Sequence, residues 1–260
     1  MKRARYLILL FLLLPHTSHA FDFMGIQPVS PNGVFSTFSA DSLPRQKVAL
    51  EMGYERSQTP NFNRFSLKGA YGITDSLEFL LTAPYIYHYS DSVDGMEDIS
   101  LGLKYRFYDE GKYGPSLALI LNVSLPTGRE EFSTNGGFGG GIIITKRVGP
   151  FKGFINVLDE KPSSSSFKNE LSFLGGIEFS AGHNFTFLGE FIAQTSDFPK
   201  DWDRLEARFG YRIRTADFIY TTIGVGFGIK GTSPDLDFLA SVSFVFPREK
   251  RGIKKIYEEE

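Results

Sequence analysis

The sequence predicts an all-β protein, a transmembrane antiparallel up-and-down β-barrel of about 12 strands. Apolar and polar residues alternate with a period of two over twelve separate segments. Most of these segments are roughly 10 residues long, the length that a tilted strand needs to cross a bilayer. A hydrophobic leader at the N-terminus also predicts export.

The leader, Met1 to Ala20, has the three parts of a secretory signal peptide. Three basic residues precede a short apolar core, Tyr6–Leu14, and Ser18-His19-Ala20 is a small-x-small cleavage site. The alternative, a membrane anchor, is disfavoured because this core spans roughly half of a hydrocarbon layer of about 30 Å. We therefore expect cleavage after Ala20, which leaves 25 basic and 30 acidic residues and a net charge of −5.

Residues 21–45 separate the leader from the first expected strand. They contain Pro28, Pro31 and Pro44 and show no periodicity. We expect a periplasmic segment that is either a partial plug folded into the barrel or a simple linker, and the sequence does not decide between them.

The barrel itself is expected over residues 46–246. The clearest segment is Arg204–Arg214, in which Leu205 and Phe209 alternate with charged residues; as a helix it would carry charge around its whole circumference. The expected strands are residues 46–56, 64–73, 77–88, 98–108, 115–126, 138–147, 151–158, 169–180, 185–194, 204–214, 218–229 and 236–246.

Short turns alternate with longer polar loops along the chain, as in outer-membrane barrels, whose periplasmic turns are tight. Twelve strands place both ends of the barrel on the periplasmic side. A hairpin recurs about every 35 to 40 residues, which also suggests a propeller, but a propeller fits four short strands into that interval.

The apolar face of each strand is expected to meet lipid. Arg or Lys on that face near the midplane costs about 2–4 kcal/mol, and the apolar faces carry almost none. Aromatics gather near strand ends, as at Tyr85, Tyr87 and Tyr105, which is typical of interfacial girdles. The alternative is a secreted sandwich in which the same residues form an internal core.

If the polar faces line the lumen, the ionisable residues there are of both signs. The candidates are Arg64, Lys68, Glu78, Lys104, Arg106, Glu178, Glu190, Arg204, Glu206, Arg208 and Arg212, with Glu51, Glu55 and Glu170. One interpretation is a structural ion-pair network that fills a narrow barrel. The other is a selectivity lining in which Arg204, Arg208 and Arg212 attract anionic groups.

The last strand ends in alternating aromatics, Leu239 to Phe246, and resembles the signal by which the barrel-assembly machinery recognises outer-membrane proteins. Pro247 stops strand pairing. Residues 247–260 are expected to form a charged periplasmic tail.

Several classes of chemistry find no support. The chain has no Cys, which removes thiol catalysis and Cys-ligated metals. The acidic run Ser90–Asp98 does not match a calcium loop, and the glycine runs near residues 137–141 and 224–228 lack the helix that a phosphate loop needs, so we interpret them as bends. We expect no catalytic residue, metal, cofactor or nucleic-acid partner.

Four short strings in order carry a family resemblance. They are Gly72-Ile73-Thr74-Asp75, Asp98–Phe107, Ser124–Gly128 and Ser233-Pro234-Asp235. Together they resemble the outer-membrane β-barrel family named for the meta-pathway of phenol degradation. The resemblance implies a transporter and brings no catalytic residues with it.

The functional hypothesis is passive passage or binding of a small hydrophobic or amphipathic solute in the outer membrane, in contact with outer-membrane lipid. Two alternatives remain. One is a lipid-modifying enzyme that uses His88 and Ser90. The other is a structural or surface-interaction barrel without transport.

Overall fold

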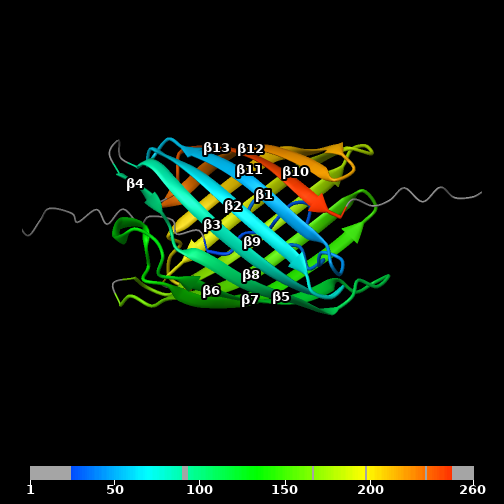
Figure 1. The fold of residues 1–260 in the computed structure, drawn as a ribbon, viewed down its shortest axis with the longest axis horizontal. Coiled ribbons are helices and arrows are strands. Elements are labelled where there is room, and N and C mark those ends of the chain that lie inside the picture. The colour runs from blue at the N-terminus through cyan, green and yellow to red at the C-terminus, as the bar shows by residue number, and fades with distance from the viewer. Residues whose placement is uncertain (1–24, 90–92, 166, 197, 232, 248–260) are drawn as a thin grey trace, which may run out of the picture.

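The computed structural model describes residues 25–89, 93–165, 167–196, 198–231 and 233–247 (Figure 1). The expected signal peptide, residues 1–20, and nearly all of the expected tail lie outside the described residues. No helix in the described part of the chain is long and apolar enough to cross a membrane.

Within the described residues the chain forms thirteen β-strands and one short 3₁₀ turn, η1 (Glu130–Phe132). The strands are β1 (Val48–Ser57), β2 (Phe62–Gly72), β3 (Leu77–Tyr89), β4 (Val93–Met96), β5 (Ile99–Tyr108), β6 (Ser116–Leu125), β7 (Gly137–Val148), β8 (Phe151–Pro162), β9 (Glu170–Ser180), β10 (Phe185–Thr195), β11 (Arg204–Ala216), β12 (Ile219–Gly231) and β13 (Leu236–Phe246).

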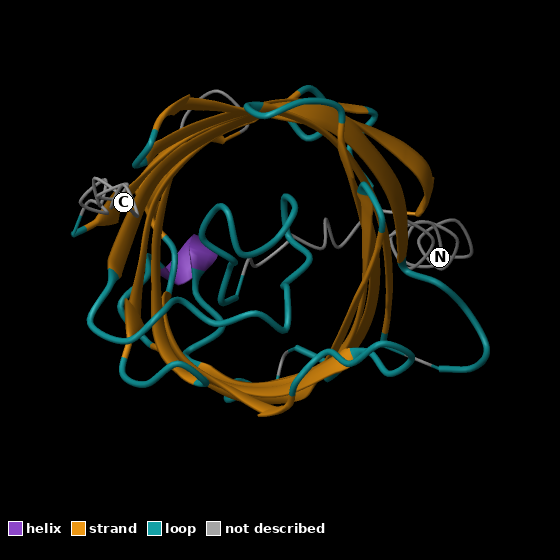
Figure 2. Cartoon of the chain, turned by 90° about the vertical axis from the view of Figure 1, so that its right-hand side faces the viewer, coloured by secondary structure: helices purple, strands orange, loops and turns teal. Residues whose placement is uncertain are grey.

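All of these strands except β4 form a closed antiparallel barrel. Each pairs with its neighbours in sequence, and β1 pairs with β13 from Val48↔Phe246 to Ser57↔Asp237, which closes the ring (Figure 2). Because closure leaves no free sheet edge, every wall strand can satisfy its backbone without water. The predicted fold class is confirmed, and each of the twelve expected strands has its counterpart within a few residues.

The short strand β4 is a difference from the sequence prediction, which has no strand between the expected strands 77–88 and 98–108. It lies at the end of the barrel that carries the longer loops, here called the outer end (left in Figure 1). Opposite β3, the pairs Tyr85↔Met96 and Thr82↔Ser100 differ in register by one residue, so β4 and β5 act as one strand with a bulge between them. The bulge turns two successive carboxylates, Glu97 and Asp98, into buried positions.

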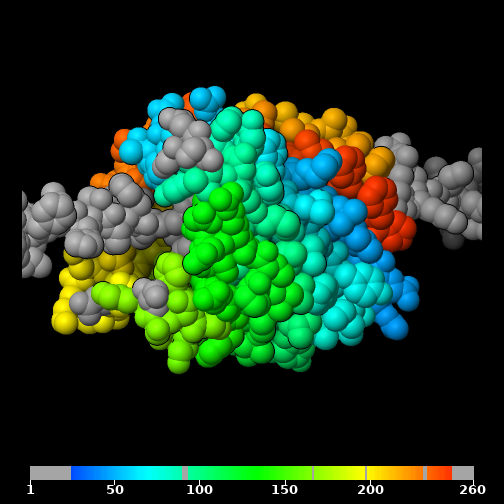
Figure 3. Space-filling view, turned by 60° about the vertical axis from the view of Figure 1, so that its left-hand side comes forward, coloured from blue at the N-terminus to red at the C-terminus, as the bar shows by residue number. Residues whose placement is uncertain are grey.

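The two faces of the wall differ as expected for a membrane barrel. Along β11, Phe209 is 57% exposed while Arg208 is 1% exposed, and Leu121 on β6 is 67% exposed. The outer surface is thus a belt of large apolar side chains, with at least one on each of the twelve wall strands. Figure 3 shows the segments from β2 to β7 side by side over one face of this surface. Such an area of apolar surface is stable only against lipid, which confirms a transmembrane barrel.

The core of the molecule lies inside the barrel. Residues 25–43, here called the internal segment, run through the ring in Figure 2. Ile26, Val29, Phe38 and Leu43 of this segment form one buried cluster with wall residues such as Leu80, Ile120 and Ile143. Apolar burial between segment and wall therefore adds to the stability of the closed barrel.

Two wall glycines make room for the internal segment. A Cβ at Gly224 would lie 2.5 Å from two ring carbons of Phe35, and one at Gly210 would lie 2.8 Å from the same ring. The sequence interpretation of the 224–228 run as a bend is therefore incomplete, because Gly224 serves as a seat for an aromatic side chain.

The loop between β6 and β7 also turns inward, at the outer end. Phe132 in η1 is fully buried in a cluster with Phe62 and Ile86. Asp98 holds this loop: its carboxylate accepts hydrogen bonds from the backbone N–H groups of Gly128, Thr134 and Gly136 at 3.0 to 3.1 Å.

Candidate functional site: the occupied lumen

The interior of the barrel is a polar wall whose side chains bond to the backbone of the internal segment. Glu190 on β10 makes the densest contact. Its Oε1 accepts hydrogen bonds from the backbone N–H groups of Ser36 (2.7 Å) and Thr37 (2.6 Å) and from the Thr37 hydroxyl (2.7 Å). A buried carboxylate here satisfies donors that would otherwise be stranded away from water.

Other wall strands repeat this arrangement. Asn156 on β8 both accepts from the Phe38 N–H (2.6 Å) and donates to the Phe38 carbonyl (3.0 Å), as a neighbouring strand would. The Thr145 hydroxyl accepts from the Ala40 N–H at 2.8 Å. Further N–H groups of the segment donate to side chains of β1 and β3: Gln27 to Thr82, Ser30 to Glu51 and Leu43 to Glu78.

The cationic side chains of the wall donate hydrogen bonds to backbone carbonyls of the internal segment. Lys104 Nζ donates to the carbonyls of Ser39 (3.1 Å) and Asp41 (2.7 Å) and forms an ion pair with Glu78. Arg212 donates to the carbonyl of Gly33 at 2.5 Å and pairs with Glu178 at 2.7 Å. These cations therefore have fixed partners.

Arg208 lies at the centre of the ionic network. Its guanidinium lies against four carboxylates, those of Glu55, Glu190, Glu206 and Asp237. It also donates to the Ser36 hydroxyl at 2.9 Å. A buried guanidinium is tolerated only when it is paired in this way.

The structure brings the predicted lumen residues together inside the barrel. All are buried except Glu170, which is half-buried at the start of β9, and Arg106, which lies at the short-turn end and pairs with Asp109. The remaining pairs are Arg64 with Glu55 and Glu97, Lys68 with Glu51, and Arg204 with Glu206. The proposed anion ladder of Arg204, Arg208 and Arg212 thus has carboxylate partners at each step.

Sequence reasoning missed the residues that hold the internal segment without charge. Asn156 and Thr145 occupy inward positions of their strands but were not singled out, since an amide or hydroxyl in a strand is common. Their inward alternation with apolar residues was the available signal. Asp98 lies on the polar face of its expected strand, with Ser100 and Lys104, but was not counted among the candidates. Glu97 was missed because the bulge buries a residue that strict alternation would place on the outer face.

Asp41 lies where the segment leaves the barrel. Burial by itself would raise the pKa of its carboxyl, but the Lys152 ammonium at 2.5 Å and the nearby Lys104 more than offset this and hold the pKa below its usual value. The ionised pair ties this end of the segment to β8.

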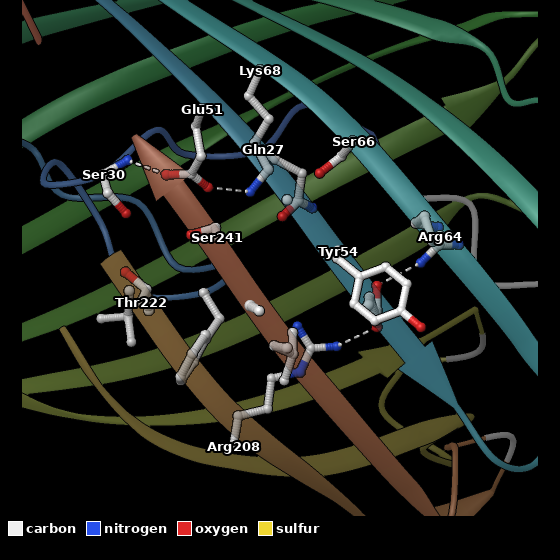
Figure 4. A pocket seen from close by; sticks show the side chains of 16 residues that line it. Gln27, Ser30, Glu51, Tyr54, Arg64, Ser66, Lys68, Arg208, Thr222 and Ser241 are labelled. Carbon is white, nitrogen blue, oxygen red and sulfur yellow. Dashed lines mark hydrogen bonds and ion pairs between the residues drawn. The ribbon is translucent and has the colours of Figure 1, made fainter. Parts of the chain in front are cut away.

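Two small cavities remain beside the internal segment, each of about 50 Å³. The inner cavity lies against β1, β2 and β13 and is lined by polar residues that include Glu51, Ser66 and Ser241 (Figure 4). The outer cavity lies against β8–β11, among Glu160, Glu170 and neighbouring side chains. At roughly 10–15 Å³ for each water molecule, either holds only a few waters, so the segment leaves no wide pore.

Neither histidine of the described barrel lies in the lumen. His88 is exposed one residue before the end of β3, and His183 is exposed in the turn before β10. Within the described residues no three His, Cys, Asp or Glu side chains are grouped so that they could hold a metal ion.

A closed barrel with an apolar outer belt and an ionic interior defines the outer-membrane class of β-barrel. The chain belongs to the family described as "Putative MetA-pathway of phenol degradation", whose model matches residues 62–246. This confirms the resemblance seen in the sequence. No curated protein sequence matches the chain closely enough to add to this comparison.

Solved structures share the fold at low identity. An outer membrane channel from Pseudomonas putida F1 is 13% identical, with a TM-score of 0.58 over 80% of this chain and 98% of its own. The NanC porin has a TM-score of 0.58 at 10% identity, and the KdgM porin 0.56 at 8%; each match covers 75% of this chain and 98% of the other. At these identities the likeness shows the fold.

Proposed function

We propose that this protein is an outer-membrane channel for the passive passage of a small hydrophobic or amphipathic solute, and that the internal segment is its plug. One observation carries the proposal. The lumen is filled by a separate stretch of chain held through side-chain contacts, instead of by large side chains of the wall itself. A segment of this kind can be displaced without unfolding the barrel.

The lining that displacement would expose suits a solute with both polar and apolar parts. Phe62, Ile86 and Phe132 form an apolar cluster at the outer end. The Arg64 guanidinium lies 5.0 Å from the Phe62 ring, so ionic groups begin where the apolar cluster ends. The described structural relatives include a KdgM porin in complex with oligogalacturonate, and passage of a small solute fits the same architecture.

The proposal includes the route to the membrane. Export through the signal peptide, cleavage after Ala20 and insertion by the barrel-assembly machinery through β13 would place the apolar belt in the outer membrane, with residues 247–260 in the periplasm. These steps rest on the sequence patterns and on the aromatic end of β13, where Phe244 and Phe246 stack with ring centroids 6.4 Å apart.

Single-channel recording in planar bilayers tests the proposal. The mature chain, residues 21–260, is compared with a chain that lacks residues 21–43. We expect brief and rare openings from the first and a stable, larger conductance from the second. If the shortened chain inserts as a heat-modifiable barrel but neither conducts ions nor speeds solute entry into liposomes, the channel proposal is wrong.

A further inference from the structure

Two residues line both cavities: Gln27 of the internal segment and Arg208 of β11. The two polar cavities beside the seated segment are thus neighbours, and both border these two side chains.

One part of the wall of the inner cavity is formed by residues with small side chains. Gly53 on β1 is paired in register with Ser66 on β2 and with Ser241 on β13. These three adjacent inward positions carry small side chains, and all three line the inner cavity. In Figure 4, Glu51 and Lys68 lie toward one end of this cavity, and Arg64 and Arg208 toward the other.

Gln27 carries a hydrogen-bonding atom that the protein does not use. Its Oε1 is buried and has no hydrogen-bond partner among the described residues, although the residue is only 8% exposed. Its backbone N–H is bound to Thr82, which holds the residue beside both cavities. An acceptor left unpaired at the junction of two cavities fits a passing donor such as a hydroxyl or an amide N–H.

Charge argues for an uncharged solute. Glu51 and Glu55 line the inner cavity together with Arg64, Lys68 and Arg208, and these groups bond to one another. The outer cavity likewise has two carboxylates, Glu160 and Glu170, and two guanidiniums, Arg204 and Arg208. With the charges nearly balanced, neither chamber strongly favours an ion of either sign, while each offers many hydrogen-bonding groups.

We infer that the barrel passes small uncharged hydrogen-bonding solutes, of the size and chemistry of glycerol or urea, along β1, β2 and β13 while the internal segment remains seated. This inference rests on the proposed channel function and adds a second, narrower route to it. Gln27 and Arg208 form the junction of this route, and Gly53, Ser66 and Ser241 set its width.

Osmotic swelling of proteoliposomes tests the inference. The full mature chain should admit glycerol and urea faster than protein-free liposomes and should exclude sucrose. Ser241→Leu fills the inner cavity and removes a hydroxyl, so glycerol entry should fall roughly tenfold. The matched control is Ala207→Leu, which also introduces a leucine but lies on the lipid-facing side of β11, away from both cavities, and should leave entry unchanged.

Gln27→Leu provides an independent variant of similar shape. It keeps the backbone bond to Thr82 and replaces the side-chain amide, with its unpaired acceptor, by an apolar group, so it should slow glycerol and urea while the folded barrel retains its heat-modifiable migration. Equal glycerol entry in Ser241→Leu, Ala207→Leu and the unaltered chain would overturn the inference.

The two proposals fail differently. If the chain without residues 21–43 admits solutes but the full chain admits neither glycerol nor urea, the narrow route is refuted and the plugged channel stands. If neither chain admits any solute, both are refuted.

Discussion

Removing the Glu190 carboxylate should release the internal segment. In Glu190→Ala the backbone N–H groups of Ser36 and Thr37 lose their acceptor at a buried site. Stranding a buried donor costs about 1–3 kcal/mol, so two of them weaken the seated state by about 3 kcal/mol when partial access of water is allowed. A difference of that size shifts the equilibrium between seated and released segment on the order of 100-fold.

The open probability of single channels in planar bilayers measures this shift. Glu190→Gln keeps an acceptor at the same position and loses only the charge assistance, so its effect should be well below that of alanine. Asp159→Ala, an exposed carboxylate on β8, is the control and should change nothing. Open probability equal to that of the unaltered chain in both Glu190 variants, with heat-modifiable migration intact, would show that these bonds do not hold the segment.

Three further predictions concern the seat, the exit and the wall. Gly224→Val should expel Phe35 and raise the open probability, since even a Cβ at Gly224 would lie 2.5 Å from the Phe35 ring. The control Gly175→Val, where a Cβ would have no atom within 4 Å, should leave the open probability unchanged. Equal currents from the two variants would show that the contact between Phe35 and Gly224 does not hold the segment. The pKa of the Asp41 carboxyl is lowered in the folded state, so the stabilisation from its ion pair is present above about pH 4 and is lost as the pH falls through the depressed pKa. Hydrogen exchange of the backbone amides of residues 38–47 should rise in that pH range. In Lys152→Met the same rise should occur at a higher pH, because the pKa is no longer held down by the Lys152 ammonium. Phe209→Arg should cost about 2–4 kcal/mol in unfolding from bilayers and Phe138→Arg, at the outer rim, about 0–1; the reverse order would mean that the wall faces the other way.

The strands could be predicted from the sequence because each carries its own alternation. The expected strand at residues 236–246 is β13 to the residue, since Pro247 and the polar residues before Leu236 bound it. Which residues point into the barrel could also be predicted where charged residues occupy one face of a strand, as on β11. The bulge at Glu97–Asp98 was not readable, because an extra residue leaves the same composition and changes only the register.

The path of the internal segment could not be predicted, for a physical reason. Its hydrogen bonds go to side chains that are remote in sequence: Phe38 bonds to Asn156, and Ser36 bonds to Glu190. Local propensity contains nothing about such contacts, and a proline-containing stretch reads equally as linker or plug. The same contacts explain why the lumen charges could be listed but not paired.

The close fit of Phe35 against Gly210 and Gly224 links three positions that are distant in the sequence. A larger residue at 224 is tolerated only where residue 35 is smaller, so Phe35→Ala should rescue Gly224→Val; at 210 the backbone of Ile223 and Gly224 excludes a Cβ whatever residue 35 is. Among homologous chains, side-chain volume at positions 35 and 224 should therefore vary inversely, while 210 stays glycine. A homologous barrel with glycine at the position of Gly224 and an aromatic residue at the position of Phe35 should therefore also have its lumen filled by its own N-terminal segment.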